Sequence, residues 1–179
     1  EQLGESKDTW LDEANYEEYI SRMEALMATT ARYTDGAVSV YYYLNPSIKG
    51  VKQGAWLLKD ADGTFVECEM TDISQYDKED VEHVGWYYIP ATKGEETWLN
   101  PYYNQNMGEE IISYVIPIIF EDEVMAVVGM DISTSILYEN IKAVTVYDTG
   151  YAFLMDSEGG FVYHPEMEGC SGTPEFDAQ

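Results

Sequence analysis

The sequence has few positive charges and no apolar run long enough to cross a membrane. Lys and Arg together number 9 against 34 Asp and Glu, so the 179-residue chain has a formal net charge of -25. This charge repels phosphate backbones, which argues against nucleic acid as a partner, and it favours cations in any cleft, although acidic surfaces also arise for solubility. The start, Glu1–Glu5, lacks a signal-peptide pattern, so we expect that any targeting or anchoring segments were removed or lie outside this sequence.

Cysteine, histidine and enzyme motifs are equally scarce. Cys68 and Cys170 have no zinc-type spacing, and a disulfide between them is not favoured because they fall in different predicted units. His83 and His164 are isolated from each other, which favours structural roles. There is no nucleophile elbow and no phosphate-binding loop, and paired carboxylates arise by chance in so acidic a chain. We therefore expect no enzyme activity, no cofactor and no metal.

Hydrophobic periodicity predicts alternating helices and strands, with an amphipathic helix from Trp10 to Arg32. The other predicted elements are a strand over 37–44, a hairpin over 54–58 and 64–68, a polar loop over 71–80, an aromatic loop over 83–90, long antiparallel strands over 111–120 and 124–132, a helix over 133–142 and a hairpin over 151–155 and 160–165. This order predicts an α+β fold, an antiparallel sheet flanked by helices. Residues 1–142 would form one unit and 143–179 the incomplete start of a second.

Asp131 stands out because it interrupts an otherwise apolar strand, where a carboxylate is costly unless something satisfies it. Two interpretations remain open: Asp131 caps the helix that follows, or it binds a cationic or hydrogen-bonding partner. Two interpretations are also open for the three consecutive aromatic residues Trp86, Tyr87 and Tyr88. They either pack in the ordinary way under a loop or bind a ligand.

Several segments in order resemble the membrane-distal half of double Cache (dCACHE) domains, which occur in bacterial chemoreceptors, sensor histidine kinases and membrane-bound diguanylate cyclases. The segments are 85–87, 97–98, 101–104, 112–115 with Pro117, and 127–132. Residues 147–153 resemble the opening of the second, membrane-proximal Cache unit, so the likeness spans about 37–165. The resemblance implies a PAS-like antiparallel sheet and an extracytoplasmic domain that senses a small molecule.

The resemblance also implies a ligand pocket over the sheet. Carried over position by position, its contacts fall on Trp86, Tyr87, Tyr102, Asn104, Tyr114 and Asp131. Asp131 would hold a ligand amino group, and each cation–π contact would add roughly 0.5 to 2 kcal/mol. Family members that bind amino acids have an arginine two residues before the tryptophan, where this chain has Val84. Without that arginine a ligand carboxylate lacks its bidentate partner, so we expect an amine without a carboxylate, such as a polyamine or quaternary amine.

Three alternatives remain open. The ligand would be an amino acid if another cationic residue replaced the arginine, or a neutral molecule such as a nucleobase, or the module would work without a ligand. The complete protein is expected to be a dimer in the cell membrane, with a transmembrane helix on each side of this region and a cytoplasmic kinase, cyclase or chemotaxis output. The long amino-terminal helix that links both Cache units in the family is not apparent in the sequence.

Overall fold

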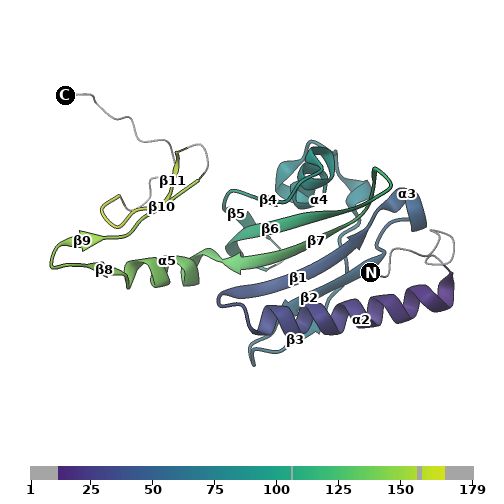
Figure 1. Ribbon diagram of the computed structural model, residues 1–179, viewed down its shortest axis with the longest axis horizontal. Coiled ribbons are helices and arrows are strands. Elements are labelled where there is room, and N and C mark those ends of the chain that lie inside the picture. Colours follow the sequence, from purple (N-terminus) through teal and green to yellow (C-terminus); the bar gives the residue numbers. More distant parts are fainter. Residues whose placement is uncertain (1–11, 106, 157–158, 168–179) are drawn as a thin grey trace.

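The computed structural model describes residues 12–105, 107–156 and 159–167, most of which form one large sheet with helices around it (Figure 1). The helices are α2 (Glu13–Arg32), α3 (Pro46–Lys49), the 3-10 turn η1 (Ile73–Gln75), α4 (Val81–Lys93) and α5 (Thr134–Lys142). The strands of the large sheet are β1 (Ala37–Leu44), β2 (Gly54–Lys59), β3 (Phe65–Glu67), β4 (Thr97–Trp98), β5 (Tyr102–Asn104), β6 (Glu109–Phe120) and β7 (Glu123–Ser133).

All neighbouring strands of this sheet pair antiparallel, in the order β3, β2, β1, β7, β6, β4, and β5 also pairs with β6. The predicted α+β architecture, an antiparallel sheet flanked by helices, is confirmed. Strands β6 and β7 form a hairpin whose two turn residues, Glu121 and Asp122, have φ angles of 50° and 62°. In this strand order, β7 lies inside the sheet, between β1 and β6.

Alternation along the strands gives the sheet two different faces. On β1, Tyr42 and Leu44 belong to the core that α2 covers. Tyr41 and Tyr43 point the other way and pack with Tyr87 of α4. In Figure 1, α2 (purple) lies along one face of the sheet and α4 (teal) lies over the other. The face under α4 is thus rich in tyrosine.

Helix α4 occupies the segment for which an aromatic loop over 83–90 was predicted, and that prediction is wrong. The Asp80 side chain caps the helix by accepting a backbone N–H of the first turn at 3.2 Å, and Gly94 ends it in the left-handed conformation. Gly85 and Pro90 lie inside the helix, and both are poor helix formers. Aromatic packing on the sheet outweighs these unfavourable local preferences.

The other predicted elements of the first unit are confirmed, with ends that differ by a few residues. The expected helix is present from Glu13, whereas Trp10 lies outside the described residues. The polar loop over 71–80 contains only the short turn η1. The helix expected over 133–142 is α5, which begins one residue later at Thr134.

Beyond α5 the chain forms two small sheets. Strand β8 (Thr145–Val146) pairs with β9 (Gly150–Tyr151), and β10 (Leu154–Met155) pairs with β11 (Phe161–Tyr163), the centre of the predicted second hairpin. The division of the chain at residue 142 into two units stays a prediction, and Cys170 lies outside the described residues. Among the residues described, no helix combines the length and apolarity that crossing a membrane requires.

Candidate functional site

A cavity of about 130 Å³ lies on the tyrosine-rich face of the sheet, beside α4 and the segment that precedes it. Its lining residues are Tyr41, Tyr43, Trp56, Met70, Thr71, Tyr76, Glu82, His83, Trp86, Tyr102, Tyr103, Asn104, Gln105 and Asp131. Half of these described lining residues are Tyr or Trp, and none is Lys or Arg. The cavity therefore combines aromatic surface with carboxylates.

Asp131 forms the polar floor of the cavity. In the strand register it lies between Ser39 of β1 and Ser113 of β6. The Ser113 hydroxyl donates to Asp131 Oδ1 at 2.7 Å, and the Ser39 hydroxyl donates to Oδ2. All three side chains are buried. Each carboxylate oxygen thus accepts one hydroxyl from a neighbouring strand and retains a lone pair for a further donor.

These contacts decide between the two interpretations of Asp131. Ser133, and not Asp131, occupies the N-cap position of α5, and the Ser133 side chain makes no capping hydrogen bond. Both oxygens of Asp131 are hydrogen-bonded within the sheet, and the side chain lines the cavity. The capping interpretation is therefore wrong.

Burial dominates the electrostatics of Asp131. Desolvation raises the pKa of Asp131 from its ordinary value to about 6, while the hydrogen bonds from Ser39 and Ser113 oppose the rise. No Lys or Arg among the described lining residues offsets the negative charge. The floor is therefore a desolvated carboxylate that a cation entering the cavity would stabilise.

Strand β5 contributes Tyr102 and Asn104. The Tyr102 hydroxyl lies 3.1 Å from Ser113 Oγ, and burial, followed by the charge on Asp131, raises the pKa of Tyr102. The Asn104 side-chain oxygen accepts the backbone N–H of Met107 at 3.1 Å, which holds the turn between β5 and β6. Tyr102 thus extends the hydrogen-bonded floor toward the edge of the sheet.

Trp86 forms the wall on the side of α4. Its indole N–H donates to the carbonyl of His83 in the same helix at 2.9 Å. Its ring meets the rings of Tyr41 and Tyr43 edge to face, with centroids 5.0 and 5.4 Å apart. The helix and two aromatic neighbours therefore fix the ring before any ligand arrives.

Tyr41 lies across β7 at Gly129, its partner in the strand register. A Cβ atom at Gly129 would lie 2.2 Å from Tyr41 Cζ, so only glycine leaves room for this ring. Tyr41 is 6% exposed, and its hydroxyl makes no hydrogen bond of normal geometry within the described residues. Burial, and then the charge on Asp131, raise the pKa of Tyr41 well above its ordinary value, while an interaction with the Ser113 hydroxyl opposes the rise.

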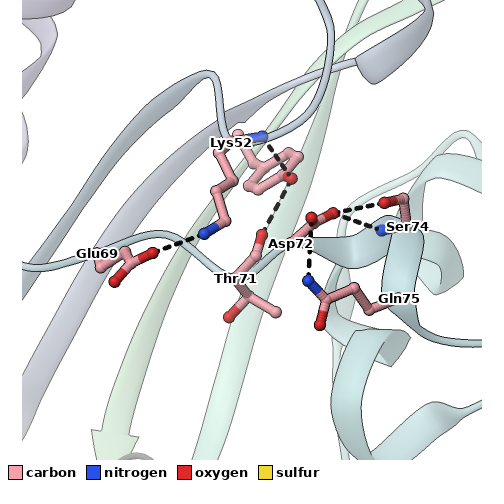
Figure 2. A network of polar contacts seen from close by, with 7 residues as sticks. Lys52, Glu69, Thr71, Asp72, Ser74 and Gln75 are labelled. Carbon is pink, nitrogen blue, oxygen red and sulfur yellow. Dashed lines mark hydrogen bonds and ion pairs between the residues drawn. The ribbon is translucent and has the colours of Figure 1, made fainter.

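The segment between β3 and α4 borders the cavity and is tied to β1 through Tyr43. The Tyr43 hydroxyl donates to the carbonyl of Thr71 at 3.1 Å and accepts the backbone N–H of Lys52 at 3.0 Å. The Lys52 ammonium pairs with Glu69 at 2.6 Å, and Asp72 caps η1 (Figure 2). One tyrosine of the cavity wall therefore anchors two surrounding loops.

The outer end of the cavity is more polar than its floor. The His83 ring stacks on Tyr76 with centroids 4.6 Å apart, and its Nδ1 lies 3.0 Å from each carboxylate oxygen of Asp80. Glu82 is exposed at this end, so solvent screens its charge.

The structure brings four of the six predicted contacts together in this cavity. They are Trp86, Tyr102, Asn104 and Asp131. Tyr87 is 4% exposed and packs in the core under α4. Tyr114 lies on the opposite face of the sheet from its neighbour Ser113, because side chains alternate along a strand, and its ring contacts Trp98. Neither Tyr87 nor Tyr114 lines the cavity.

The remaining lining residues were not predicted from the sequence to contact a ligand. They are Tyr41, Tyr43, Trp56, Met70, Thr71, Tyr76, Glu82, His83, Tyr103 and Gln105. One signal was present, because Ser39 and Ser113 each place a hydroxyl in an otherwise apolar strand, as Asp131 places a carboxylate. Such isolated polar residues on neighbouring strands indicate a shared polar site only once the strand order is known.

Val84, at the position of the family's arginine, is fully buried in the core under α4 and does not line the cavity. Whether a ligand carboxylate would find a cationic partner in the cavity therefore depends on the lining residues. Among those described, His83 is the one basic side chain, and it is engaged with Asp80. Within the described ranges, no group of three or more His, Cys, Asp or Glu side chains is arranged to hold a metal ion.

Curated proteins with similar sequences are bacterial chemoreceptors. The chain is 26% identical over 112 residues to the methyl-accepting chemotaxis protein PctB of Pseudomonas aeruginosa, which covers 62% of this chain and 17% of PctB. It is 28% identical over 85 residues to McpC of Bacillus subtilis, covering 47% of this chain and 13% of McpC. The chain thus matches less than a fifth of the length of these relatives.

Solved structures with the same fold are sensor domains. The ligand-binding domain of the Campylobacter jejuni chemoreceptor Tlp3, solved with L-valine, aligns with a TM-score of 0.59 at 17% identity, covering 90% of this chain and 56% of that one. An extracellular domain assigned to the histidine kinase mmHK1S-Z2 aligns with a TM-score of 0.60 at 20% identity, covering 86% and 58%. These likenesses confirm the PAS-like fold expected from the Cache resemblance.

The family model for the first PDC sensor domain of methyl-accepting chemotaxis protein-like receptors matches residues 23–139. The match runs from α2 to α5 and includes all of α4 and every cavity-lining strand. The chain therefore belongs to the family of methyl-accepting chemotaxis protein-like first PDC sensor domains.

Proposed function

We propose that this chain is the extracytoplasmic sensing region of a membrane receptor and that its cavity binds a small amine without a carboxylate. Asp131 binds the ammonium group, and the surrounding aromatic rings cover the rest of the ligand. The curated relatives are chemotaxis receptors, which supports a receptor role for the longer protein. Ligand binding would act by favouring one of two conformations that differ in affinity for the ligand.

The observation that carries this proposal is the charge of the cavity. Its floor holds a buried carboxylate, and no Lys or Arg is among the described lining residues. An ammonium bound at Asp131 would form an ion pair, in which each charge compensates the other for the water that it loses. The faces of the surrounding aromatic rings would attract the cation in addition. A ligand carboxylate in the same space would meet a like charge without a bidentate partner.

An amino acid is the second candidate, because the Tlp3 domain with the same fold was solved with L-valine. His83 is the lining side chain that would have to meet the ligand carboxylate, and its Nδ1 is already within 3.0 Å of Asp80. A neutral ligand such as a nucleobase would use the aromatic wall alone and would leave Asp131 without a counter-charge.

A thermal-shift screen at pH 7.5 tests the proposal. Putrescine, choline, L-valine, adenine and acetate would each be added to the purified chain, with the Asp131→Asn variant beside it. A ligand at about 100 times its Kd stabilises the folded state by about 2.7 kcal/mol, which raises Tm by roughly 5 °C or more. We expect the two amines to raise Tm in the wild-type chain and not in the variant.

The other possible results of the screen would support a different ligand or no ligand. A shift with L-valine that equals the shift with amines would overturn the argument against a carboxylate. A shift with adenine alone would support a neutral ligand. No shift with any compound would support a module that works without a ligand.

Trp86→Leu tests the aromatic wall. Leucine keeps apolar contact with Tyr41 and Tyr43 but removes the ring face, so we expect amine affinity to fall roughly 2- to 30-fold. The matched control is Trp98→Leu, because Trp98 is 55% exposed and contacts Tyr114 away from the cavity. Isothermal titration calorimetry measures both, and equal losses in the two variants would contradict a role for the Trp86 ring.

A further inference from the structure

The floor of the cavity contains a buried tyrosine hydroxyl that lacks a well-formed hydrogen bond. The Tyr41 hydroxyl is buried and makes no hydrogen bond of normal geometry within the described residues, yet the residue lines the cavity beside Asp131. An unsatisfied buried hydroxyl costs free energy, so native proteins retain few of them without a reason.

Packing holds this hydroxyl where it is. The Tyr41 ring lies over Gly129, where a Cβ atom would come within 2.2 Å of it, and its edge contact with Trp86 closes the other side. The ring therefore has little freedom to turn its hydroxyl toward solvent. The oxygen stays at the floor, close enough for the charge on Asp131 to raise the Tyr41 pKa.

The other hydroxyl groups of the floor have already used their protons. Ser39 and Ser113 donate to the two carboxylate oxygens of Asp131. Because Ser113 has given its proton to Asp131, the Tyr102 hydroxyl at 3.1 Å must donate to Ser113 Oγ. A ligand at the floor therefore meets acceptors rather than free hydroxyl protons on these three residues, and lone pairs on Asp131 and on the Tyr41 oxygen are among those acceptors.

We infer that Tyr41 is a ligand-binding residue and that, given the proposed amine site, the floor selects an ammonium that carries N–H groups over a quaternary ammonium. A primary ammonium has three donors and no acceptor, so one N–H binds the Asp131 carboxylate and another binds the Tyr41 oxygen. A trimethylammonium group cannot donate a hydrogen bond. It would leave the Tyr41 hydroxyl unsatisfied and hold its own charge farther from Asp131.

Two matched ligand pairs test this inference by titration calorimetry at pH 7.5: butylamine with butyltrimethylammonium, and 2-phenylethylamine with its N,N,N-trimethyl derivative. The proteins are the wild-type chain, Tyr41→Phe and Asp131→Asn. We expect wild type to prefer the primary amine by about 10-fold or more. Tyr41→Phe should weaken the primary amine by about 10-fold and leave the trimethyl compound unchanged, so the preference shrinks by the same factor.

The stability of the ligand-free variant is a second readout. Tyr41→Phe removes an unsatisfied hydroxyl and keeps the ring, so Tm should stay the same or rise. The control is Tyr42→Phe on the opposite face, because the Tyr42 side chain is buried there and its hydroxyl interacts with Tyr19. Tyr42→Phe should lower Tm and leave the affinity for both amines unchanged.

The outcomes separate this inference from the proposed function. If Asp131→Asn abolishes binding while Tyr41→Phe changes neither ligand, or changes both equally, the amine site stands and the role of Tyr41 is refuted. A drop in the Tm of ligand-free Tyr41→Phe would likewise show that the hydroxyl serves the fold. If none of the four compounds binds wild type, or Asp131→Asn binds them as well as wild type, the proposed function itself fails.

Discussion

Asp131→Asn is expected to lower the affinity for an amine by about 100-fold or more. Removing one partner of a buried ion pair costs about 3 to 5 kcal/mol, because the remaining charge stays desolvated without a counter-charge. Asparagine has nearly the same size and can still hydrogen-bond Ser39 and Ser113, so the strands should keep their register. Titration calorimetry with the amine that gives the largest thermal shift measures the loss.

The matched control for Asp131→Asn is Glu82→Gln. Both substitutions remove one negative charge from the cavity lining, but Glu82 is exposed and Asp131 is 3% exposed. Solvent screens the exposed charge, so Glu82→Gln should weaken binding by less than about 5-fold. Equal losses in the two variants would mean that net charge attracts the ligand and that no specific carboxylate holds it.

The second large effect is a dependence of amine binding on pH. Burial raises the pKa of Asp131 to about 6 in the ligand-free chain. The ammonium binds the ionised form, so affinity should be highest above about pH 7 and should fall as pH drops through 6, approaching tenfold per pH unit below it. Calorimetry in buffers with different ionisation enthalpies should also detect proton release on binding near pH 6.

The same pKa predicts the opposite trend for the stability of the ligand-free chain. Between about pH 4 and 6 the folded state binds a proton at Asp131 that the unfolded state has already released, so this residue makes the chain less stable as pH rises through that window. A rise of about two pKa units corresponds to about 3 kcal/mol. Urea unfolding of the wild type relative to Asp131→Asn should therefore show a difference that grows from pH 4 to 7. A difference that is independent of pH would mean that Asp131 has an ordinary pKa in the folded chain.

Local patterns in the sequence predict most of the large sheet. A run of β-branched and aromatic residues that stops at Asn45-Pro46 marks β1, and the Glu121–Asp122 turn separates the two long strands. These signals are local, because β-branched and aromatic side chains favour strands and turn residues end them, whatever the neighbouring strands are. The first helix is also predicted from a local signal, because its apolar residues recur at helical spacing.

Local patterns fail at α4, which carries part of the cavity wall. Gly85, Pro90 and three consecutive aromatic residues favour a loop, although Asp80 and Gly94 stand at the right positions to cap a helix of 13 residues. The packing of Tyr87 against Tyr43 stabilises the helix, and that contact joins residues distant in sequence. Trp86 is therefore predicted as a contact through the family resemblance, while the helix that positions it is not.

The sequence by itself determined the α+β class, the acidic charge and the anomaly of Asp131 in an apolar strand, because composition and periodicity are local properties. Only the tertiary structure decided what surrounds that carboxylate. Ser39 is 92 residues away along the chain and Ser113 is 18 away, and both reach Asp131 because β7 pairs with β1 and with β6 in one particular register. The same register places Tyr41 over Gly129 with its hydroxyl at the floor, and it turns Tyr114 to the opposite face, since a shift of one residue would exchange the two faces of a strand.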